Sequence, residues 1–255
     1  MSVRPPKGKK IRLDALLVDR GLVESRSRAQ ALVMAGKVFS KEQKLEKAGK
    51  QITEDTPLEV RGQDHPWVSR GGLKLAHGLD CFQIDPGGMT CLDIGVSTGG
   101  FTDVLLQNGA ARVYAVDVGH GQLAWKLRSD ERVIVLERTN ARYLNAAEIA
   151  APIDLIVCDA SFIGLRTVLP AAMTLAKPGA GLVALIKPQF EVGKGQVGKR
   201  GVVRDPVQHR EVCDMIRSWL DGLSDWRTIG IDESPITGPE GNKEFLIYGL
   251  KQNDD

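Results

Sequence analysis

The chain has 255 residues, of which 42% are hydrophobic and 26% are charged, as is ordinary for a globular protein of one large or two smaller domains. No apolar run approaches the roughly 20 residues that a membrane-spanning helix needs. The basic N-terminus, MSVRPPKGKK, is not followed by the apolar segment of a signal peptide. We therefore expect a cytoplasmic protein that does not associate with a membrane.

The net charge of +2 hides an asymmetry along the chain. Residues 1–50 hold 13 Lys and Arg against 5 Asp and Glu, a local net charge of +8, and the remaining residues carry a net charge of −6. A basic N-terminal region followed by an acidic remainder favours an anionic partner for residues 1–50. The alternative is a basic surface that is only solvated.

The four cysteines have no CxxC spacing and the four histidines lie far apart in the chain. Neither a disulfide framework nor a zinc site is indicated by these spacings. We expect the cysteines to be packing residues and expect no bound metal.

Residues 1–10 are predicted to form a flexible basic tail, residues 11–61 a small α+β unit and residues 62–70 a linker. Apolar spacing and stop signals, such as the glycine after the second helix, define the elements of the small unit. Its predicted elements are two helices and two short strands, at 12–20, 25–36, 37–39 and 57–61.

From residue 71 to residue 252, short apolar runs alternate with helical stretches, as in a parallel α/β sheet. Candidate strands lie at 90–94, 112–117, 133–137, 153–158, 180–186, 226–234 and 243–250. Candidate helices lie at 72–82, 100–108, 121–128, 163–176 and 206–222. A loop rich in Gly and Pro joins the last two strands and favours an antiparallel hairpin. The prediction is an α/β fold with a seven-stranded Rossmann-like sheet, typical of class I methyltransferases.

The first of these strands runs into DIGVSTGGFTD, residues 93–103. Its glycines allow a sharp turn, and the helix that follows presents free N–H groups to an anion. The spacing is G-x-x-x-G-G, whereas dinucleotide sites have G-x-G-x-x-G. It therefore favours the methionine end of S-adenosylmethionine and disfavours an NAD-dependent oxidoreductase. Asp117, at the end of the second strand, can bind ribose hydroxyls. The alternative is a tight turn that binds nothing.

Two charged residues follow buried strands of the predicted sheet. Asp159 comes after the strand at 153–158, and Lys187 after the strand at 180–186. Open α/β sheets bind ligands at these carboxyl ends. Read alone, the two could be a structural ion pair. Lys74 and Glu244 are further candidates, although the sequence alone cannot bring the four residues together.

These motifs resemble a known family. The similar runs are VSRGGLKL, DIGVSTGGFTD, AVDVGHGQLAWKL, RTNARYL, CDASFIGL, LIKPQFE and GNKEF. They resemble the TlyA family of ribosomal RNA ribose 2′-O-methyltransferases, sometimes labelled haemolysin A, and the catalytic half resembles the wider FtsJ class. RLDALLVDRGLVESRSRAQALVMAGKV is similar to the small RNA-binding domain called S4. The resemblance covers about residues 11–250.

The resemblance implies S-adenosylmethionine-dependent methylation of a ribose 2′-hydroxyl, with cytidine as the nucleoside, in ribosomal RNA or ribosomal subunits. It implies a catalytic tetrad of Lys74, Asp159, Lys187 and Glu244. It also implies cofactor contacts at Asp93, Gly95, Ser97, Thr98, Gly99, Phe101, Asp117, Val118, Asn140 and Asp159. Lys187 would accept the hydroxyl proton or stabilise the developing oxyanion, and the two acids would orient the two ammonium groups. The oligomeric state stays open.

Basic residues in two regions are expected to contact RNA phosphates. They are Arg12, Arg26, Arg28 and Lys37 in the N-terminal unit, and Lys194, Lys199 and Arg200 after the catalytic lysine. The run GKGQVGK matches the start of a Walker A loop, but an arginine replaces the required Ser or Thr, so nucleoside triphosphate binding is rejected. Trp67 could stack on a base or pack the linker.

Two positions depart from the family pattern: His120 replaces a commoner tyrosine, and SKEQK near residue 41 lacks the Asn-Gly pair of a hairpin turn. The main rival function is an RNA-binding or ribosome-assembly protein with an inactive catalytic domain. A pore-forming haemolysin is disfavoured because no membrane-active segment is evident.

Overall fold

The computed structural model describes residues 10–20, 22–23, 25–61, 65–193, 198, 201–238 and 241–253. Its larger part is a seven-stranded sheet in the order β11-β12-β10-β9-β6-β7-β8. The strands are β6 (Thr90–Ile94), β7 (Arg112–Val116), β8 (Val133–Leu136), β9 (Ile153–Cys158), β10 (Ala176–Ile186), β11 (Trp226–Glu233) and β12 (Phe245–Lys251). The first five are parallel, and β12 pairs antiparallel with both β10 and β11. The predicted α/β class, the seven strands and the terminal hairpin are confirmed.

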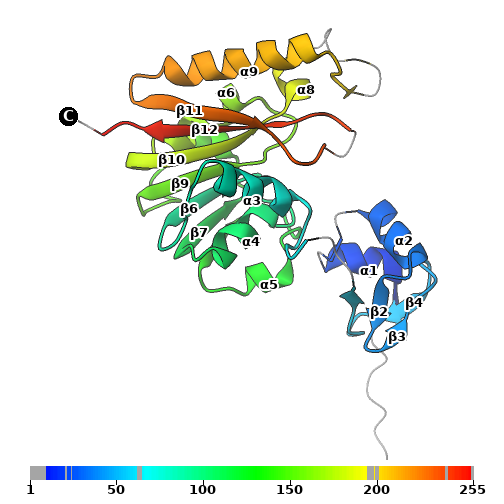
Figure 1. Cartoon of the computed structure of the whole chain (residues 1–255). Coiled ribbons are helices and arrows are strands. Elements are labelled where there is room, and N and C mark those ends of the chain that lie inside the picture. Colours follow the sequence, from blue (N-terminus) through cyan, green and yellow to red (C-terminus); the bar gives the residue numbers. More distant parts are fainter. Residues whose placement is uncertain are drawn as a thin grey trace, which may run out of the picture.

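Helices cover both faces of this sheet (Figure 1). One face carries α3 (Gly71–Cys81), α4 (Gly100–Gln107) and α5 (Trp125–Arg128), and the other carries α6 (Leu165–Val168), α7 (Pro170–Met173) and α9 (Pro206–Asp221). The central strand β9 alternates between the two layers, since Leu155 and Val157 enter one core while Ile156 and Cys158 enter the other. A parallel sheet buried on both faces requires this nearly continuous apolar sequence.

A smaller hydrophobic core lies in the N-terminal part of the chain. Its helices are α1 (Leu13–Asp19) and α2 (Arg26–Met34), and its strands are β1 (Lys10–Arg12), β2 (Val38–Ser40), β3 (Gln43–Lys44), β4 (Gln51–Thr53) and β5 (Glu59–Val60). The predicted apolar faces of the two helices meet in this core. The Ser25 hydroxyl caps α2 by accepting from the Arg28 amide, and Gly36 follows the helix with a φ of +68°, so the predicted start and stop signals are confirmed.

Several predicted elements differ from the observed ones. The expected helix at 163–176 is two short helices, because Pro170 has no N–H to continue α6, and β10 begins earlier than the expected residue 180. The expected helix at 121–128 is reduced to α5, since Gly121 has a φ of +71°. The short elements β1, β3, β4, the 3-10 turn η1 (Ala141–Tyr143) and α8 (Pro188–Glu191) were missed, because two to four residues carry no periodicity. Residues 1–9 of the expected tail lie outside the described residues.

The hairpin between β2 and β3 forms without an Asn-Gly turn. Phe39 pairs with Lys44 and Ser40 pairs with Gln43, which leaves a two-residue loop. Lys41 takes the left-handed conformation in this loop, with a φ of 54°. A lysine therefore supplies the backbone geometry that Asn or Gly commonly supplies.

Within the expected 62–70 linker, the described residues 65–70 pack against the helices that cover the large sheet. Trp67 packs against α3, because a Cβ on Gly72 would lie 2.4 Å from its ring. The Val68 amide donates to Asp103 Oδ2 at 2.7 Å, and Lys126 forms an ion pair with the same oxygen at 2.9 Å. Of the two alternatives for Trp67, the structure thus favours packing.

Asp14 is a fully buried carboxylate between the two helices of the N-terminal part. Arg12 donates to both of its oxygens, at 3.0 and 2.8 Å, and Gln30 donates to Oδ2 at 3.0 Å. Arg26 adds a longer ion pair at 3.3 Å. Hydrogen bonds from Arg12, together with those from Gln30 and Arg26, hold the pKa of Asp14 well below its usual range. Because the two arginines are half exposed, solvent screens part of this attraction.

Asp14→Asn is expected to lower the thermal unfolding midpoint of the N-terminal part by about 5 °C at pH 7. An amide cannot accept from two guanidinium groups as a carboxylate does. Since the folded-state pKa is depressed, this contribution is present above about pH 4 and is lost as the pH falls further. Calorimetry of the full chain between pH 3 and pH 7 measures it. The exposed Asp19→Asn is the control, and equal midpoints for the two variants at pH 7 would contradict this role.

Candidate active site

The residues that directly follow the five parallel strands form a row, and four of the five have charged side chains. In sheet order, the residues that follow these strands are Lys187 after β10, Asp159 after β9, Gly95 after β6, Asp117 after β7 and Glu137 after β8. Adjacent strands lie about 4.8 Å apart, so the row extends for roughly 19 Å. An elongated ligand can therefore contact residues from several strands at once.

The turn between β6 and α4 is shaped for close approach of the backbone. Gly95 has a φ of +81°, and a Cβ there would lie 2.8 Å from the backbone of Ala160, which follows β9. Ser97 also has a positive φ, of 49°, and Gly99 has one of +96°. Glycine adopts such conformations without strain, so Gly95 and Gly99 permit this turn, whereas Ser97 takes its positive φ at some cost.

Asp93 is completely buried beneath the turn. Its Oδ2 accepts from the Thr102 hydroxyl at 2.6 Å, whereas its Oδ1 is buried without a hydrogen-bond partner. Burial raises the pKa of Asp93 to about 7, and the nearby Asp159 carboxylate adds to the rise. A buried carboxylate with an unpaired oxygen is suited to a cationic or hydrogen-bond-donating ligand.

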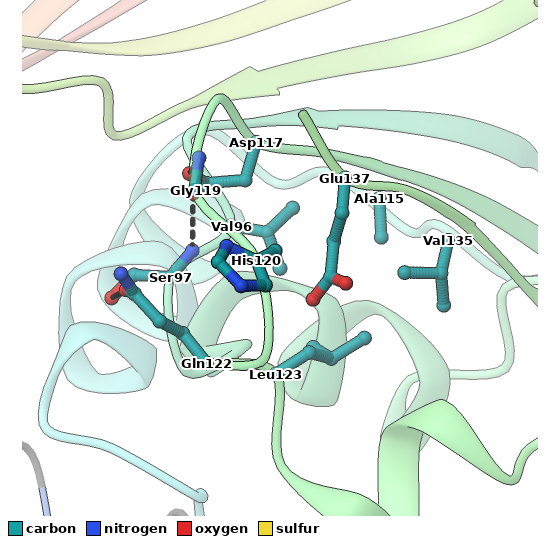
Figure 2. A pocket seen from close by; sticks show the side chains of 10 residues that line it. All are labelled: Val96, Ser97, Ala115, Asp117, Gly119, His120, Gln122, Leu123, Val135 and Glu137. Atoms are coloured by element: carbon teal, nitrogen blue, oxygen red, sulfur yellow. Dashed lines mark hydrogen bonds between the residues drawn. The ribbon is translucent and has the colours of Figure 1, made fainter. Parts of the chain in front are cut away.

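Asp117 is held by the backbone on both sides. Its Oδ2 accepts from the Ser97 amide at 2.8 Å, and its Oδ1 accepts from the Gly119 amide at 2.7 Å (Figure 2). A carboxylate has about four acceptor positions, so two remain for other donors. Ser97 and Asp117, both predicted to contact the cofactor, are therefore joined directly by a hydrogen bond.

A pocket adjoins this acid, and its walls combine apolar and polar side chains (Figure 2). Its lining residues are Val96, Ser97, Ala115, Asp117, Gly119, His120, Gln122, Leu123, Val135 and Glu137. Glu137 forms an ion pair with Arg128 and accepts from the Gly121 amide at 2.8 Å. Burial would raise the pKa of Glu137, but these partners lower it. The sequence analysis missed this residue, although its place directly after a parallel strand is the same signal that identified Asp117.

The remaining residues predicted to contact the cofactor lie near the carboxyl edge of the sheet, and they differ in exposure and in their hydrogen bonds. Val118 is exposed, and the Asn140 side chain accepts from the Arg142 amide, so it caps η1. The Thr98 carbonyl accepts from the Ala124 amide. Phe101 is buried in the core beneath α4, so any ligand contact it makes would use its main-chain N–H.

The four proposed catalytic side chains form one continuous chain of alternating charges. Lys74 Nζ lies 2.6 Å from Glu244 Oε2 and 3.7 Å from Asp159 Oδ2. Lys187 Nζ lies 2.5 Å from Asp159 Oδ1 and donates to the Asp159 carbonyl at 3.0 Å. The order is therefore Glu244, Lys74, Asp159 and Lys187. Lys74 lies on α3, Asp159 and Lys187 directly follow β9 and β10, and Glu244 directly precedes β12.

Burial makes these contacts strong. Both lysines and Glu244 are buried, whereas the Asp159 side chain retains 21% exposure. Burial alone would lower the pKa of Lys74, but the Asp159 and Glu244 carboxylates outweigh it and the pKa is raised. Lys74 is therefore a permanent cation that fixes the two acids. Lys187 also donates to the Ser161 hydroxyl at 2.9 Å, a partner that the sequence analysis missed.

Glu244 is placed by a tightly packed loop. Its Oε1 lies so close to Gly238 that a Cβ there would approach it to 2.6 Å. Nearby, the buried Asn242 accepts from the Val203 amide at 2.9 Å and donates to the Gly201 carbonyl at 3.0 Å. Asn242 thus joins the loop before β12 to the segment that precedes α9.

Phe162 directly follows Ser161, whose hydroxyl accepts from Lys187. Its side chain is 91% exposed, and its φ is +65°, a strained value for a non-glycine residue. Its ring lies 5.2 Å from that of Phe190. A large exposed apolar ring held by a strained backbone is a candidate contact for a flat ligand. The sequence does not reveal which aromatic side chains are exposed, so the sequence analysis could not identify Phe162.

The predicted RNA contacts fall into three groups. Arg12 and Arg26 are half exposed and pair with Asp14, and Arg28 is exposed on α2. Lys37 is half buried, and its carbonyl accepts from the Arg61 amide. The residues Lys194, Lys199 and Arg200 lie outside the described residues.

Comparison with known proteins agrees with this architecture. Residues 67–251 match the FtsJ-like methyltransferases, and residues 11–56 match the S4 domain. The 16S/23S rRNA (cytidine-2'-O)-methyltransferase TlyA of Mycobacterium tuberculosis is 48% identical over 248 residues, which cover 96% of this chain and 92% of that protein. The Hemolysin A of Brachyspira hyodysenteriae is 39% identical over 239 residues, which cover 93% of this chain and 99% of that protein.

A solved structure of a hemolysin-named protein from Streptococcus thermophilus superimposes with a TM-score of 0.76 at 43% identity. The match covers 96% of this chain and 91% of that one. Family resemblance, sequence identity and fold therefore agree over nearly the whole length. The chain belongs to the FtsJ-like methyltransferases, as a member of the TlyA family that carries an S4 domain.

Proposed function

We propose that the protein transfers a methyl group from S-adenosylmethionine to a ribose 2′-hydroxyl, that of a cytidine, in ribosomal RNA. The observation that carries this proposal is the chain of alternating charges from Glu244 to Lys187 beside the glycine turn. The names of the relatives support the reaction and the nucleoside. Such an enzyme would meet its substrate in the cytoplasm, on ribosomal subunits or their RNA.

The residues along the sheet edge fit S-adenosylmethionine. The unpaired Oδ1 of Asp93 is suited to an interaction with the ammonium of the methionine part, and the free acceptor positions of Asp117 suit ribose hydroxyls. The remaining predicted cofactor positions, from Gly95 to Asn140, lie around the same edge. When bound, this cofactor would supply a methyl group on a sulfonium, which is already a strong electrophile.

The protein's own residues then have two tasks, which are alignment of the hydroxyl and removal of its proton. Lys187 is held by Asp159 and Ser161 at the carboxyl edge, so its Nζ can hold the 2′-oxygen or receive its proton. In this transfer, an uncharged Lys187 amine would receive the hydroxyl proton, whereas a Lys187 ammonium would stabilise the developing oxyanion and the proton would leave to water. Lys74 and Glu244 keep Asp159 in place and neutralise the buried charges.

We propose residues 11–61 as the RNA-binding unit and residues 71–252 as the catalytic unit. Phosphate contacts from Arg12, Arg26, Arg28 and Lys37 would supply affinity without sequence choice. The exposed ring of Phe162 offers a stacking surface for a base near the reacting ribose.

Two other functions were weighed. An RNA-binding or ribosome-assembly protein without activity would not need the buried charge chain, which is intact. Within the described part of the chain, no helix is both long enough and apolar enough to cross a membrane.

Transfer of labelled methyl from S-adenosylmethionine to unmodified ribosomal subunits tests the proposal directly. Label at a single cytidine that resists alkaline cleavage would support ribose 2′-O-methylation, because cleavage requires a free 2′-hydroxyl. Cofactor binding without labelling of either subunit would favour the inactive RNA-binding alternative.

Lys187→Ala is expected to reduce methyl transfer by roughly 10²-fold or more while leaving S-adenosylmethionine affinity within about twofold. The lysine acts on the hydroxyl proton, whereas the cofactor contacts lie at neighbouring strands. Single-turnover transfer and equilibrium binding measure the two effects. Lys243→Ala removes an exposed lysine from the same region and serves as the control. Turnover near that of the wild type in Lys187→Ala would remove this residue from the mechanism.

Asp93→Asn is expected to stabilise the unliganded protein relative to the wild type as the pH rises from about 4 towards 8. The raised folded-state pKa, about 7, means that ionising this buried acid costs stability above the unfolded pKa, and the amide does not ionise. The same change should weaken S-adenosylmethionine binding, because the ammonium loses its counter-charge. Thermal unfolding against pH, without and with cofactor, measures both. A pH-independent difference, or unchanged cofactor affinity, would contradict the assignment.

Replacing Arg26 and Arg28 together by Ala is expected to weaken RNA binding and to reduce the slope of log affinity against log salt by about 1 to 2. Each phosphate contact releases roughly one counterion. Filter binding of ribosomal RNA at several salt concentrations measures the slope. The exposed Arg217→Ala on α9 is the matched control. Unchanged affinity in the double variant would place the RNA surface elsewhere.

A further inference from the structure

We propose that His77, Cys81 and Asp232 form a binding site for a soft divalent cation of the Zn²⁺ type. The three ligand atoms, an imidazole nitrogen, a thiol sulfur and a carboxylate oxygen, all lie within 4.8 Å of one another. His77 Nε2 lies 2.6 Å from Asp232 Oδ2, and the Cys81 sulfur lies within 4.8 Å of both ligand atoms. The site lies outside the catalytic charge chain and does not rest on the proposed function.

The ligand set has the chemistry of a zinc site. Thiolate, imidazole and carboxylate are the three side-chain ligands that Zn²⁺ takes in proteins, and three of them leave a fourth position for water. Exposed acid clusters alone lack the sulfur and nitrogen that select Zn²⁺ over hard cations. Here one of each type converges on a single point.

The spacing along the chain explains the convergence. His77 and Cys81 are four residues apart on α3, so their side chains lie on the same face of the helix. Asp232 comes from β11, more than 150 residues later, where it faces that side of the helix. A sequence scan for near-neighbour ligands could not find this site, which is why no metal was expected.

The backbone around the cluster is already rigid. Phe82, directly after Cys81, stacks on Tyr248 of β12 with 5.3 Å between ring centroids. It also packs against β11, since a Cβ on Gly230 would lie 3.1 Å from its ring. The end of α3 is therefore held on the terminal hairpin without any metal, and little ordering is left for binding to cost.

Only small side-chain movements are needed to bind the cation. Tetrahedral coordination with the usual zinc bond lengths puts ligand atoms about 3.3–3.6 Å apart. His77 Nε2 and Asp232 Oδ2, which are 2.6 Å apart, lie closer than this, and no two of the three ligand atoms are more than 4.8 Å apart. Cys81 is exposed and the other two residues are half exposed, so their side chains can rotate and the ion can enter from solvent.

A cation here would join α3 to β11. Lys74 lies one helical turn before His77, and Glu244 lies just before β12, the neighbour of β11. The metal would thus connect the two elements that bring this catalytic pair together. Binding to the folded state alone raises stability, so the effect is measurable without any assay of activity.

The experiment is a Co²⁺ titration of the full-length, tag-free protein, followed by displacement with Zn²⁺. The wild type is expected to form a saturable one-to-one complex with a thiolate-to-cobalt charge-transfer band, which Zn²⁺ abolishes. Cys81→Ser is expected to lose the band, and His77→Ala and Asp232→Asn to bind at least tenfold more weakly. Cys213→Ser, at a half-buried thiol on α9, should behave as the wild type.

Thermal unfolding provides the second readout. Zn²⁺ is expected to raise the midpoint of the wild type and of Cys213→Ser by a few degrees, reversibly with chelator, but not that of Cys81→Ser. Absence of saturable binding by the wild type would overturn the proposal. So would a charge-transfer band that survives in Cys81→Ser or disappears in Cys213→Ser, or unchanged affinity in both His77→Ala and Asp232→Asn.

Discussion

Two ammonium groups and two carboxylates share the buried end of the sheet, and none could stay there alone, because an unpaired buried charge is far costlier than a paired one. Asp159 lies between the two lysines, and Lys74 connects it to Glu244. This mutual neutralisation depends on α3, β9, β10 and β12 meeting at one edge. The order of strands in the sheet, with the antiparallel β12 inserted beside β10, is therefore a requirement of the site as well as of the fold.

The same edge separates two kinds of environment. Around Asp93 and Asp117, carboxylates are held by backbone amides and a hydroxyl, and one oxygen remains unpaired. Around Lys187, cations and anions alternate. A ligand along the row thus meets acceptors at one end and a positioned ammonium at the other. Methyl transfer needs little more than this, because alignment and removal of one proton are the main tasks of such an enzyme.

The N-terminal part repeats the principle on a smaller scale. A buried acid, Asp14, gathers two arginines that the sequence analysis assigned to RNA. Each of the two arginine side chains pairs with the buried Asp14 and is also about half exposed to solvent. The basic charge of this region therefore helps to organise the small core, while Arg28 stays exposed on α2.

The sequence by itself determined the α/β class, the seven strands, the terminal hairpin and the glycine turn, because these depend on local periodicity and on conformations that only glycine adopts easily. It also identified Lys74, Asp159, Lys187 and Glu244 by position and resemblance. Only the tertiary structure decided that they touch, since their contacts span up to 170 residues. It likewise revealed the exposed ring of Phe162, the partners of Asp14 and the meeting of His77 and Cys81 with Asp232. Exposure and long-range convergence arise from packing, and no local pattern in the chain records them.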